Sequence, residues 1–234
     1  MTIASNFAAI RDRIDRATAR AGRNPGDVAL MAVSKTQPSA NIIEAYEAGQ
    51  RLFGENRVQE FANKFPQLAE LHDAEFHMIG HLQSNKATKA AEIFHAVDSI
   101  DSAKLAQRLN DAAQKLGKTL NVLIEINIGG EEAKSGIAPD SAELESILSG
   151  ASAWKNLCIR GLMTVPPYTE DPEGARPHFR KLRELRNRLA DRHLLSVNLD
   201  VLSMGMSHDF EVAIEEGSTC VRIGTALFGT RPKP

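Results

Sequence analysis

Short apolar runs alternate with longer amphipathic segments eight times along this chain of 234 residues. Apolar runs bounded by turn residues are typical of strands buried on both faces, and the segments between them carry apolar residues at helical spacing. The alternation predicts a parallel sheet covered by helices. The strands we expect span residues 28–35, 51–55, 75–80, 94–100, 121–128, 158–165, 198–206 and 220–228.

Helices are expected between these strands and also before the first one. At the N-terminus, apolar residues from Ile3 to Ala17 recur at helical spacing and predict an amphipathic helix that packs on the body. Ser102 and Gly117 have the residue types that begin and end a helix. The later helices we expect span residues 39–49, 57–65, 83–91, 102–116, 141–154, 173–192 and 208–216.

Eight strands in a chain of this length, with no linker, repeat or composition shift, predict an α/β fold: a single (β/α)₈ TIM barrel with an extra N-terminal helix, forming one domain over residues 1–234. A doubly wound open sheet is the alternative. The first strand is followed by Lys35 to Pro38 and not by a glycine-rich phosphate turn, so the dinucleotide fingerprint is absent. The barrel is therefore the favoured fold.

Charge and hydropathy exclude several classes of function. Lys and Arg number 28 against 30 for Asp and Glu, so the net charge of −2 does not favour nucleic acid as a partner. No apolar stretch approaches the roughly 20 residues needed to cross a bilayer, and no signal-peptide core is present. Cys158 and Cys220 lack metal-ligand spacing and are expected to be buried thiols. We therefore expect a cytoplasmic protein in a reducing compartment.

Lys35 closes the first apolar run. An ammonium group at the end of a buried strand loses hydration, which lowers the pKa of the lysine and leaves a fraction as the free amine that attacks carbonyl groups. In the alternative interpretation the side chain extends into solvent and has no special role. Lys35 is thus a candidate nucleophile.

Arg222 lies within the last predicted strand, where alternation of side chains directs its guanidinium into the barrel. A buried guanidinium needs a carboxylate, a phosphate or an acceptor on a bound ring. A ligand is one source of such a partner. The structural alternative is a salt bridge to an interior acid: Glu55, Glu125 or Asp200.

An anion site is predicted beside Arg222. Gly224 and Thr225 follow the same strand, where backbone N–H groups can converge on a phosphate, and Ser207 adds a hydroxyl from the preceding strand. Asn56, after the second strand, either places an amide near a bound ring or simply forms a turn.

Four further residues lie near the expected mouth of the barrel and are given no role: His77, His81, Lys134 and Tyr168. Two histidines at this spacing without a third ligand do not predict a metal site. The amine of Lys134 is expected to be solvated.

Six sequence motifs resemble those of one family, in the same order and over nearly the whole chain. The motifs are AVSKT from residue 32, FGENRVQE from 53, HMIGHLQSNK from 77, GLMT from 161, SMGMSHD from 203 and VRIGT from 221. They resemble the pyridoxal phosphate homeostasis proteins, barrel proteins related to the N-terminal domain of alanine racemase. In one place the chain is unusual for this family, because His81 fills a variable position.

The resemblance implies that pyridoxal 5′-phosphate (PLP) is the cofactor, held as a lysine imine. An arginine beside the pyridine nitrogen would keep that nitrogen unprotonated and make the ring a poorer electron sink, which suits a carrier better than a versatile catalyst. By this resemblance the site residues are Lys35 for the imine, Ser207, Gly224 and Thr225 for the phosphate, Arg222 for the pyridine nitrogen and Asn56 beside the ring.

We therefore expect a protein that binds PLP and related B6 vitamers and contributes to vitamin B6 homeostasis without catalytic turnover. PLP-dependent apoenzymes are candidate recipients, and a monomer is expected because no apolar stripe is left over. A PLP-dependent amino-acid racemase and a Schiff-base aldolase are the alternatives. Racemases of this type also use a tyrosine from a second domain, whereas this chain ends after the eighth strand and has only Tyr46 and Tyr168, so negligible racemisation is expected.

Overall fold

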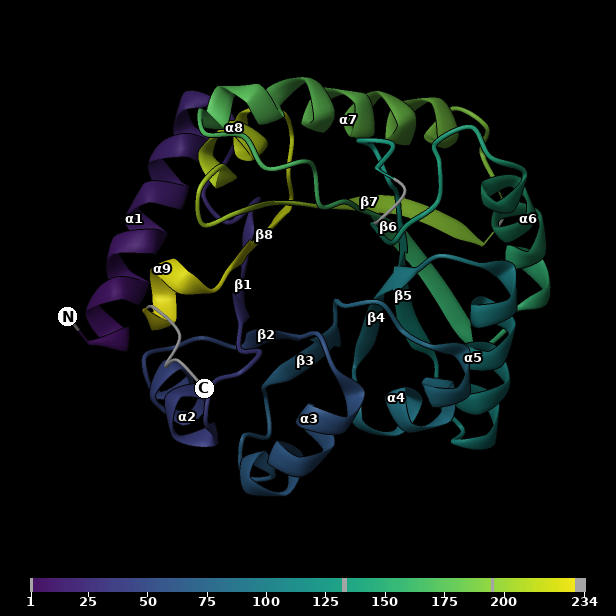
Figure 1. Ribbon diagram of the computed structural model, residues 1–234, viewed down its shortest axis with the longest axis horizontal. Coiled ribbons are helices and arrows are strands. Elements are labelled where there is room, and N and C mark those ends of the chain that lie inside the picture. The colour runs from purple at the N-terminus through teal and green to yellow at the C-terminus, as the bar shows by residue number, and fades with distance from the viewer. Residues whose placement is uncertain (1, 132–133, 195, 230–234) are drawn as a thin grey trace.

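The computed structural model describes residues 2–131, 134–194 and 196–229. Eight parallel strands close into a barrel in which each strand pairs with the next and the eighth pairs with the first (Figure 1). The predicted barrel is confirmed, and the open-sheet alternative is wrong. The strands are β1 (Ala29–Val33), β2 (Leu52–Glu55), β3 (Glu75–Met78), β4 (Ala96–Ile100), β5 (Leu120–Glu125), β6 (Leu157–Met163), β7 (Val197–Met206) and β8 (Cys220–Ile223).

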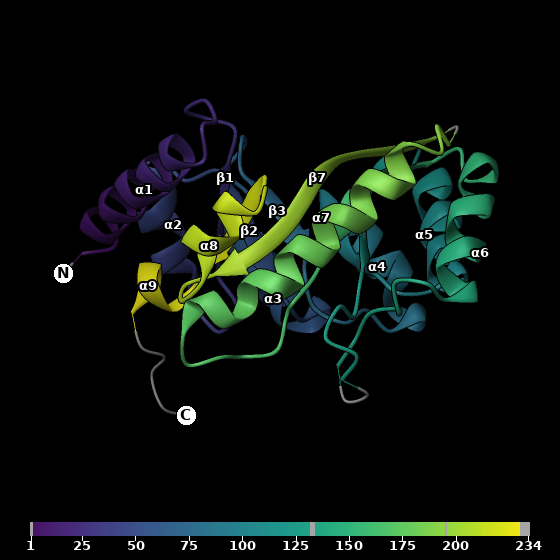
Figure 2. The ribbon, with the colours of Figure 1, turned by 90° about the horizontal axis from the view of Figure 1, so that it is seen from above.

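Helices surround the barrel and follow the strands in turn (Figures 1 and 2). Short 3₁₀ turns η1 to η4 lie at Phe65–Leu68, Ser84–Lys86, Ala151–Ala153 and Pro172–Ala175. The α-helices are α1 (Ile3–Arg20), α2 (Ser39–Glu47), α3 (Val58–Lys64), α4 (Ala87–Ile93), α5 (Ala103–Lys115), α6 (Ala142–Gly150), α7 (Arg176–Ala190), α8 (Phe210–Glu215) and α9 (Thr225–Phe228).

The N-terminal helix α1 packs against α8 and α9, as Figure 1 shows at the left of the barrel. Its apolar face is buried at Ile10, Ile14 and Ala17, which confirms the predicted amphipathic helix. The Asn6 side-chain amide also donates a hydrogen bond of 2.9 Å to the Leu227 carbonyl oxygen in α9. The first helix therefore supports the segment that follows the last strand.

Helix boundaries follow local capping chemistry. The Ser102 hydroxyl accepts a hydrogen bond of 3.2 Å from the Leu105 N–H, which satisfies one of the free donors at the start of α5. At the other end of α5, Gly117 has φ of +64°, a left-handed conformation that glycine adopts at little cost. Both ends of this helix were predicted from these residue types.

An aromatic cluster fills the layer between the barrel and the helices on one side. The Phe61 ring of α3 lies 4.8 Å from Phe76 of β3 and 4.7 Å from Phe94, and Phe53 of β2 stacks on Phe76 at 5.3 Å between ring centroids. All four residues are almost fully buried. Aromatic rings bury a large apolar area, so this cluster fixes α3 on the strands.

Most of the predicted strands are too long, and two of these differences bear on the site. β1 ends at Val33, so Lys35 lies in the loop beyond it and not in the strand. The predicted strand over residues 220–228 ends at Ile223, and α9 follows it. The reason is Gly224, whose ψ of −79° leaves the extended region and turns the chain into the helix.

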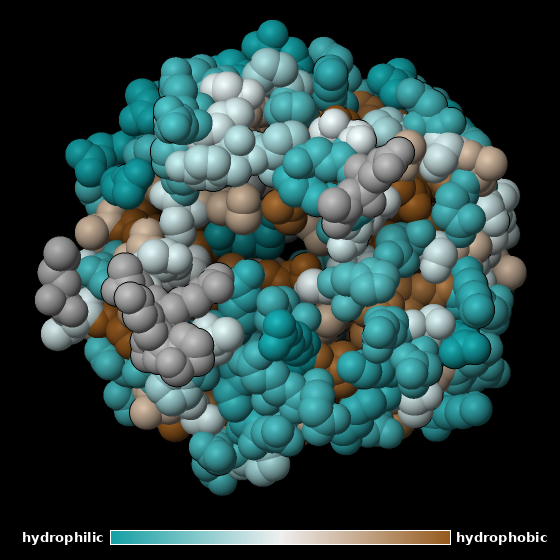
Figure 3. Space-filling model, in the orientation of Figure 1, coloured by the Kyte–Doolittle hydropathy of each residue, from teal (hydrophilic) through white to brown (hydrophobic). Residues whose placement is uncertain are grey.

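The outer surface is mainly hydrophilic on the face of Figure 3, and a hollow lies near its centre, at the barrel axis. Among the described residues, no helix combines the length and apolarity needed to cross a membrane.

Candidate cofactor site

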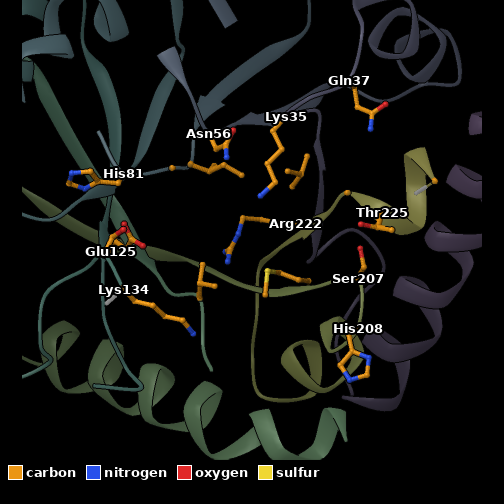
Figure 4. Close-up of a pocket in the computed structure, with 18 residues that line it drawn as sticks. Lys35, Gln37, Asn56, His81, Glu125, Lys134, Ser207, His208, Arg222 and Thr225 are labelled. Atoms are coloured by element: carbon orange, nitrogen blue, oxygen red, sulfur yellow. The ribbon is translucent and has the colours of Figure 1, made fainter. Parts of the chain in front are cut away.

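A cavity of about 530 Å³ opens where the barrel strands end. Parallel strands bring the residues at their carboxyl ends to one edge, so side chains far apart in sequence converge there. All six predicted site residues line this cavity: Lys35, Asn56, Ser207, Arg222, Gly224 and Thr225. Figure 4 shows Ser207 and Thr225 on one side of it, with the side chains of Lys35 and Arg222 near the middle.

Lys35 is half-buried, and both of its neighbours are held by carboxylates. The Ser34 hydroxyl donates a hydrogen bond of 2.7 Å to Glu55 Oε1, and the Thr36 N–H donates one of 2.6 Å to Glu60 Oε1. Thr36 has φ of +63°, which is unfavourable for a β-branched residue and needs support from its surroundings. The lysine is therefore presented by a constrained segment.

Lys64 joins these two carboxylates. Its ammonium lies 2.8 Å from Glu55 Oε1 and 3.1 Å from Glu60 Oε1, and it donates to the Ser34 carbonyl oxygen at 3.2 Å. Burial raises the pKa of Glu55 although Lys64 opposes the rise. Burial also acts to raise the pKa of Glu60, but the hydrogen bonds from Thr36 and Lys64 outweigh it and the pKa is lowered. The network thus holds the Lys35 loop with charge-assisted hydrogen bonds.

Arg222 is buried and directed into the barrel, as its place in the strand predicted. Its Nη1 donates to the Ser203 hydroxyl at 2.8 Å, and its Nη2 donates to the Thr164 carbonyl oxygen at 2.7 Å. Burial lowers the pKa of this guanidinium. These bonds fix the orientation of the group in the cavity.

The salt bridges that the sequence suggested for Arg222 are not found among the described residues. Glu55 binds Lys64 instead. Asp200 is exposed and lies 3.9 Å from Arg160, so it is not an interior acid. Glu125 lines the cavity and interacts electrostatically with Arg222 without a direct ion pair.

The proposed anion site joins the ends of β7 and β8. The Ala226 N–H donates a hydrogen bond of 3.4 Å to the Ser207 hydroxyl. Before Ser207, the Met206 N–H donates to Asp209 Oδ1 at 2.6 Å and shapes the loop after β7. Ser207 is thereby held against the segment that begins at Gly224.

The side chain of Asn56 indicates whether the residues of the cavity fit a ligand. Its Oδ1 atom is buried without a hydrogen-bond partner among the described residues, and Asn56 lines the cavity. Gly80 permits the approach of this loop, because a Cβ atom at Gly80 would come within 2.5 Å of the Asn56 carbonyl oxygen. An unpartnered acceptor at the cavity can take a hydrogen bond from a ligand, so the residues present fit a bound polar group.

Three residues of the cavity were missed or misjudged as site residues. The sequence suggested Glu125 only as a possible partner of Arg222. The feature that could have identified it as a site residue is its position, an acidic residue at the end of an apolar run. Lys134 lines the cavity, donates to the Pro166 carbonyl oxygen at 3.1 Å and pairs with Glu131, so its amine is only partly solvated. His81 also lines the cavity, with Nδ1 lying 3.0 Å from Asp101 Oδ2.

His77 does not lie at the mouth, contrary to expectation. It lines a separate cavity of about 250 Å³ together with the amino-terminal residue of β1, Ala29, and Cys220 of β8. Its Nδ1 lies 3.2 Å from Asp98 Oδ2. No group of His, Cys, Asp and Glu that could hold a metal ion occurs within residues 2–131, 134–194 and 196–229.

The cysteines and Tyr168 have no part in the site. Both cysteines are free, but only Cys220 is buried as predicted, because Cys158 is half-buried on β6. Tyr168 is 79% exposed and packs near the ring of His208.

Comparison with known proteins identifies the family. A family model described as the N-terminal domain of alanine racemase matches residues 5–232. The pyridoxal phosphate homeostasis protein of Aquifex aeolicus is 46% identical over 231 residues, which cover 99% of this chain and 99% of that protein. This chain belongs to the pyridoxal phosphate homeostasis protein family. A second member, from Escherichia coli, is 45% identical over 98% of this chain and 97% of its own length.

Solved structures agree with this family. PipY of Synechococcus elongatus without PLP has a TM-score of 0.86 and 39% identity, covering 97% of this chain and 100% of PipY. PipY with PLP bound has a TM-score of 0.84 and 38% identity over the same shares of the two chains. Alanine racemase of Clostridium difficile has a TM-score of 0.74 but 15% identity, and this chain covers 57% of it, so it shows the shared fold alone.

Proposed function

We propose that this chain binds PLP at the carboxyl end of the barrel and contributes to vitamin B6 homeostasis. The observation that carries the proposal is the convergence of Lys35, Arg222 and the Ser207 hydroxyl on one cavity. An amine, a fixed guanidinium and an anion site are the groups that an aldehyde, a pyridine ring and a phosphate require. PipY, a relative of similar structure, has been solved with PLP bound.

In this proposal Lys35 forms the imine with the cofactor aldehyde. Ser207 and the backbone of Gly224 and Thr225 hold the phosphate, where a glycine leaves room for close approach. Asn56, whose Oδ1 atom has no hydrogen-bond partner among the described residues, would lie beside the ring. When bound, the cofactor supplies a reactive aldehyde, and the protein keeps it masked.

Arg222 is the residue that favours storage over turnover. Its orientation is fixed by Ser203 and Thr164, and a positive charge beside the pyridine nitrogen disfavours protonation of that nitrogen. An unprotonated ring stabilises carbanions poorly, so reactions at the α-carbon of an amino acid are suppressed. The relatives are named homeostasis proteins, which is consistent with a protein that is not an enzyme.

The absorbance spectrum of the purified protein with PLP, followed by borohydride reduction and mass analysis, tests the proposal. We expect a visible imine band and an adduct of one PLP on Lys35. Lys35→Ala should lose the band and the adduct, whereas Lys89→Ala, at an exposed position in α4, should keep both. An adduct that remains in Lys35→Ala, for example on Lys134, would contradict the assignment.

The racemase alternative gains no support from the described part of the site. No tyrosine lines the described cavity, and the exposed Tyr168 is not part of it, so a second proton-transfer group of the racemase type is not in evidence there. We therefore propose that the protein acts as a one-domain, monomeric and cytoplasmic carrier of B6 vitamers. PLP-dependent apoenzymes would be the recipients. Light scattering checks the monomeric state, and transfer assays to such an apoenzyme check the recipients.

A further inference from the structure

The cavity extends beyond the residues that the proposed function uses. Figure 4 shows Ser207 and Thr225 on one side, and Glu125, His81 and Lys134 on the other. All five side chains line the same cavity. The half that holds Glu125 therefore has room for a group other than the phosphate end of the cofactor.

Glu125 is placed in this half by the sheet itself. It is the last residue of β5 and pairs with Met163 of β6, and its carbonyl oxygen accepts a hydrogen bond of 2.9 Å from the Ile137 N–H. The residue is 7% exposed. Its backbone is thus held on two sides while the carboxyl group faces the cavity.

One oxygen of the Glu125 carboxyl group lacks a donor among the described residues. This atom, Oε2, is buried. An ionised carboxylate only accepts hydrogen bonds, and leaving such a group buried without a donor is costly. A ligand with N–H donors would remove this cost.

Charged groups of several elements surround Glu125. Lys134, from the loop after β5, lines the same half of the cavity, where its ammonium pairs with Glu131. Arg222 of β8 and His81, after β3, favour its ionised form, whereas Asp101, after β4, opposes it. Burial is the largest effect and raises the pKa of Glu125 to about 7, with Arg222 opposing the rise. A cationic ligand would therefore find a carboxyl group that is ready to ionise at neutral pH.

We propose that Glu125 forms a binding subsite for the primary ammonium group of a small ligand that sits beside PLP. The inference rests on the proposed function, because it gives the stored cofactor a route of release. The ligand class is a primary amine, since a buried carboxylate beside a cavity selects a compact cation with several N–H donors.

An amine seated at Glu125 can replace Lys35. The ammonium would give one proton to the Glu125 carboxylate, and the neutral ligand nitrogen would form a bond to the carbon of the protonated imine. A second proton would pass from the ligand nitrogen to Lys35 Nζ, the bond from the carbon to Nζ would break, and Lys35 would leave as a neutral amine while the new imine keeps one proton. Amine is exchanged for amine, so the step needs neither an oxidant nor a reductant.

Calorimetry of the full chain tests the subsite without this exchange. Protein loaded with PLP is first reduced with borohydride, so that Lys35 cannot be displaced, and is then titrated with ethylammonium chloride in two buffers of different ionisation enthalpy. Because the pKa of Glu125 is about 7, we expect the release of about half a proton per ligand bound at pH 7. This readout uses the unmodified sequence and does not depend on the folding of a variant.

Variants separate Glu125 from other carboxylates. Glu125→Gln should weaken ethylammonium binding about tenfold or more and abolish proton release, because a charge-assisted hydrogen bond is lost. Glu70→Gln, at an exposed carboxyl group outside the cavity, should leave both unchanged. If Glu125→Gln bound ethylammonium as tightly as the unmodified protein does, or if the protein bound propionate more tightly than ethylammonium, Glu125 would not be an ammonium subsite.

The two proposals can fail separately. If no adduct forms on Lys35, the proposed PLP function is wrong. If the adduct forms but ethylammonium neither binds nor releases a proton, only the amine subsite is wrong.

Discussion

The Thr36 N–H donates a hydrogen bond of 2.6 Å to the Glu60 carboxylate, and this bond spans the loop after β1 and helix α3. Thr36 has a left-handed backbone conformation that threonine rarely adopts, and it follows Lys35 directly. Glu60 therefore stabilises the conformation that presents the lysine to the cavity.

Glu60→Ala should loosen the Lys35 loop. We expect a loss of about 1–2 kcal/mol in the free energy of unfolding, because the Thr36 amide loses a charge-assisted hydrogen bond. PLP affinity should fall about fivefold to tenfold, which corresponds to about 1 kcal/mol. Urea denaturation and titration of the imine band measure the two effects, with the exposed Glu70→Ala as the control. A destabilised variant with unchanged PLP affinity would show that the loop does not depend on Glu60.

Arg222→Gln should change the spectrum of the bound cofactor more than its affinity. The guanidinium is assigned to the pyridine nitrogen, so its loss alters ring protonation and the pKa of the imine, whereas the phosphate contacts of Ser207 and Thr225 remain. Absorbance spectra across pH, compared with binding of PLP and of pyridoxal, check this. A large loss of PLP affinity with an unchanged spectrum would place Arg222 at the phosphate instead.

Gly80→Ala should be destabilising because a Cβ atom there would come within 2.5 Å of the Asn56 carbonyl oxygen. We expect a cost of about 1–3 kcal/mol in thermal or urea unfolding, together with weaker PLP binding as the Asn56 loop moves. Adding Asn56→Ala should not rescue stability, since the closest contact is with backbone. Full rescue by the double variant would mean that the clash involves the side chain.

His77 makes folding stability depend on pH. Burial disfavours its charged form, but Asp98 and Glu75 outweigh burial and raise the pKa from 6.5 to about 9. His95 also lies near His77, and a proton on His95 opposes protonation of His77. A raised pKa means that the folded state binds the proton more tightly, so the stabilisation is full below pH 6.5 and is lost as pH rises through about 9.

The effect of His77 is measurable by urea denaturation between pH 6 and pH 9.5. His77 should contribute a loss of about 3 kcal/mol across this interval in the unmodified protein. Asp98→Asn should flatten the dependence, because the carboxylate that attracts the protonated ring is gone. An equal slope in both proteins would rule out this ion pair as the cause.

The barrel was predictable because most strands contain short apolar runs that alternate with amphipathic helical segments, although β7 also carries the exposed Asn198 and Asp200. Strand ends were less predictable, since they depend on register and backbone angles. Gly224 turns the chain after β8, and nothing in the apolar residues that follow it distinguishes a helix from a strand. Likewise, Asp200 lies on β7 between Val197 and Val201, where the pairing with β6 shifts register, so its exposed position could not be read from alternation alone.

At the site, the sequence indicated which residue types matter better than it indicated how far along the barrel axis each one lies. Lys35 and Arg222 were found because charged groups beside apolar runs need an explanation. His77 was misplaced because alternation indicates the inward direction but not the level along the barrel axis. Glu125 was considered only as an ion-pair partner, since the absence of a donor for its second oxygen depends on tertiary packing.

The closure of β8 onto β1 has a consequence for biosynthesis. Lys35 emerges early from the ribosome, whereas Arg222 and Gly224 are among the last barrel residues to be made. Until β8 pairs with β1, the part of the cavity wall beside Lys35 that Arg222 and Gly224 supply is missing. The complete cavity can thus form only after the final strand has been translated.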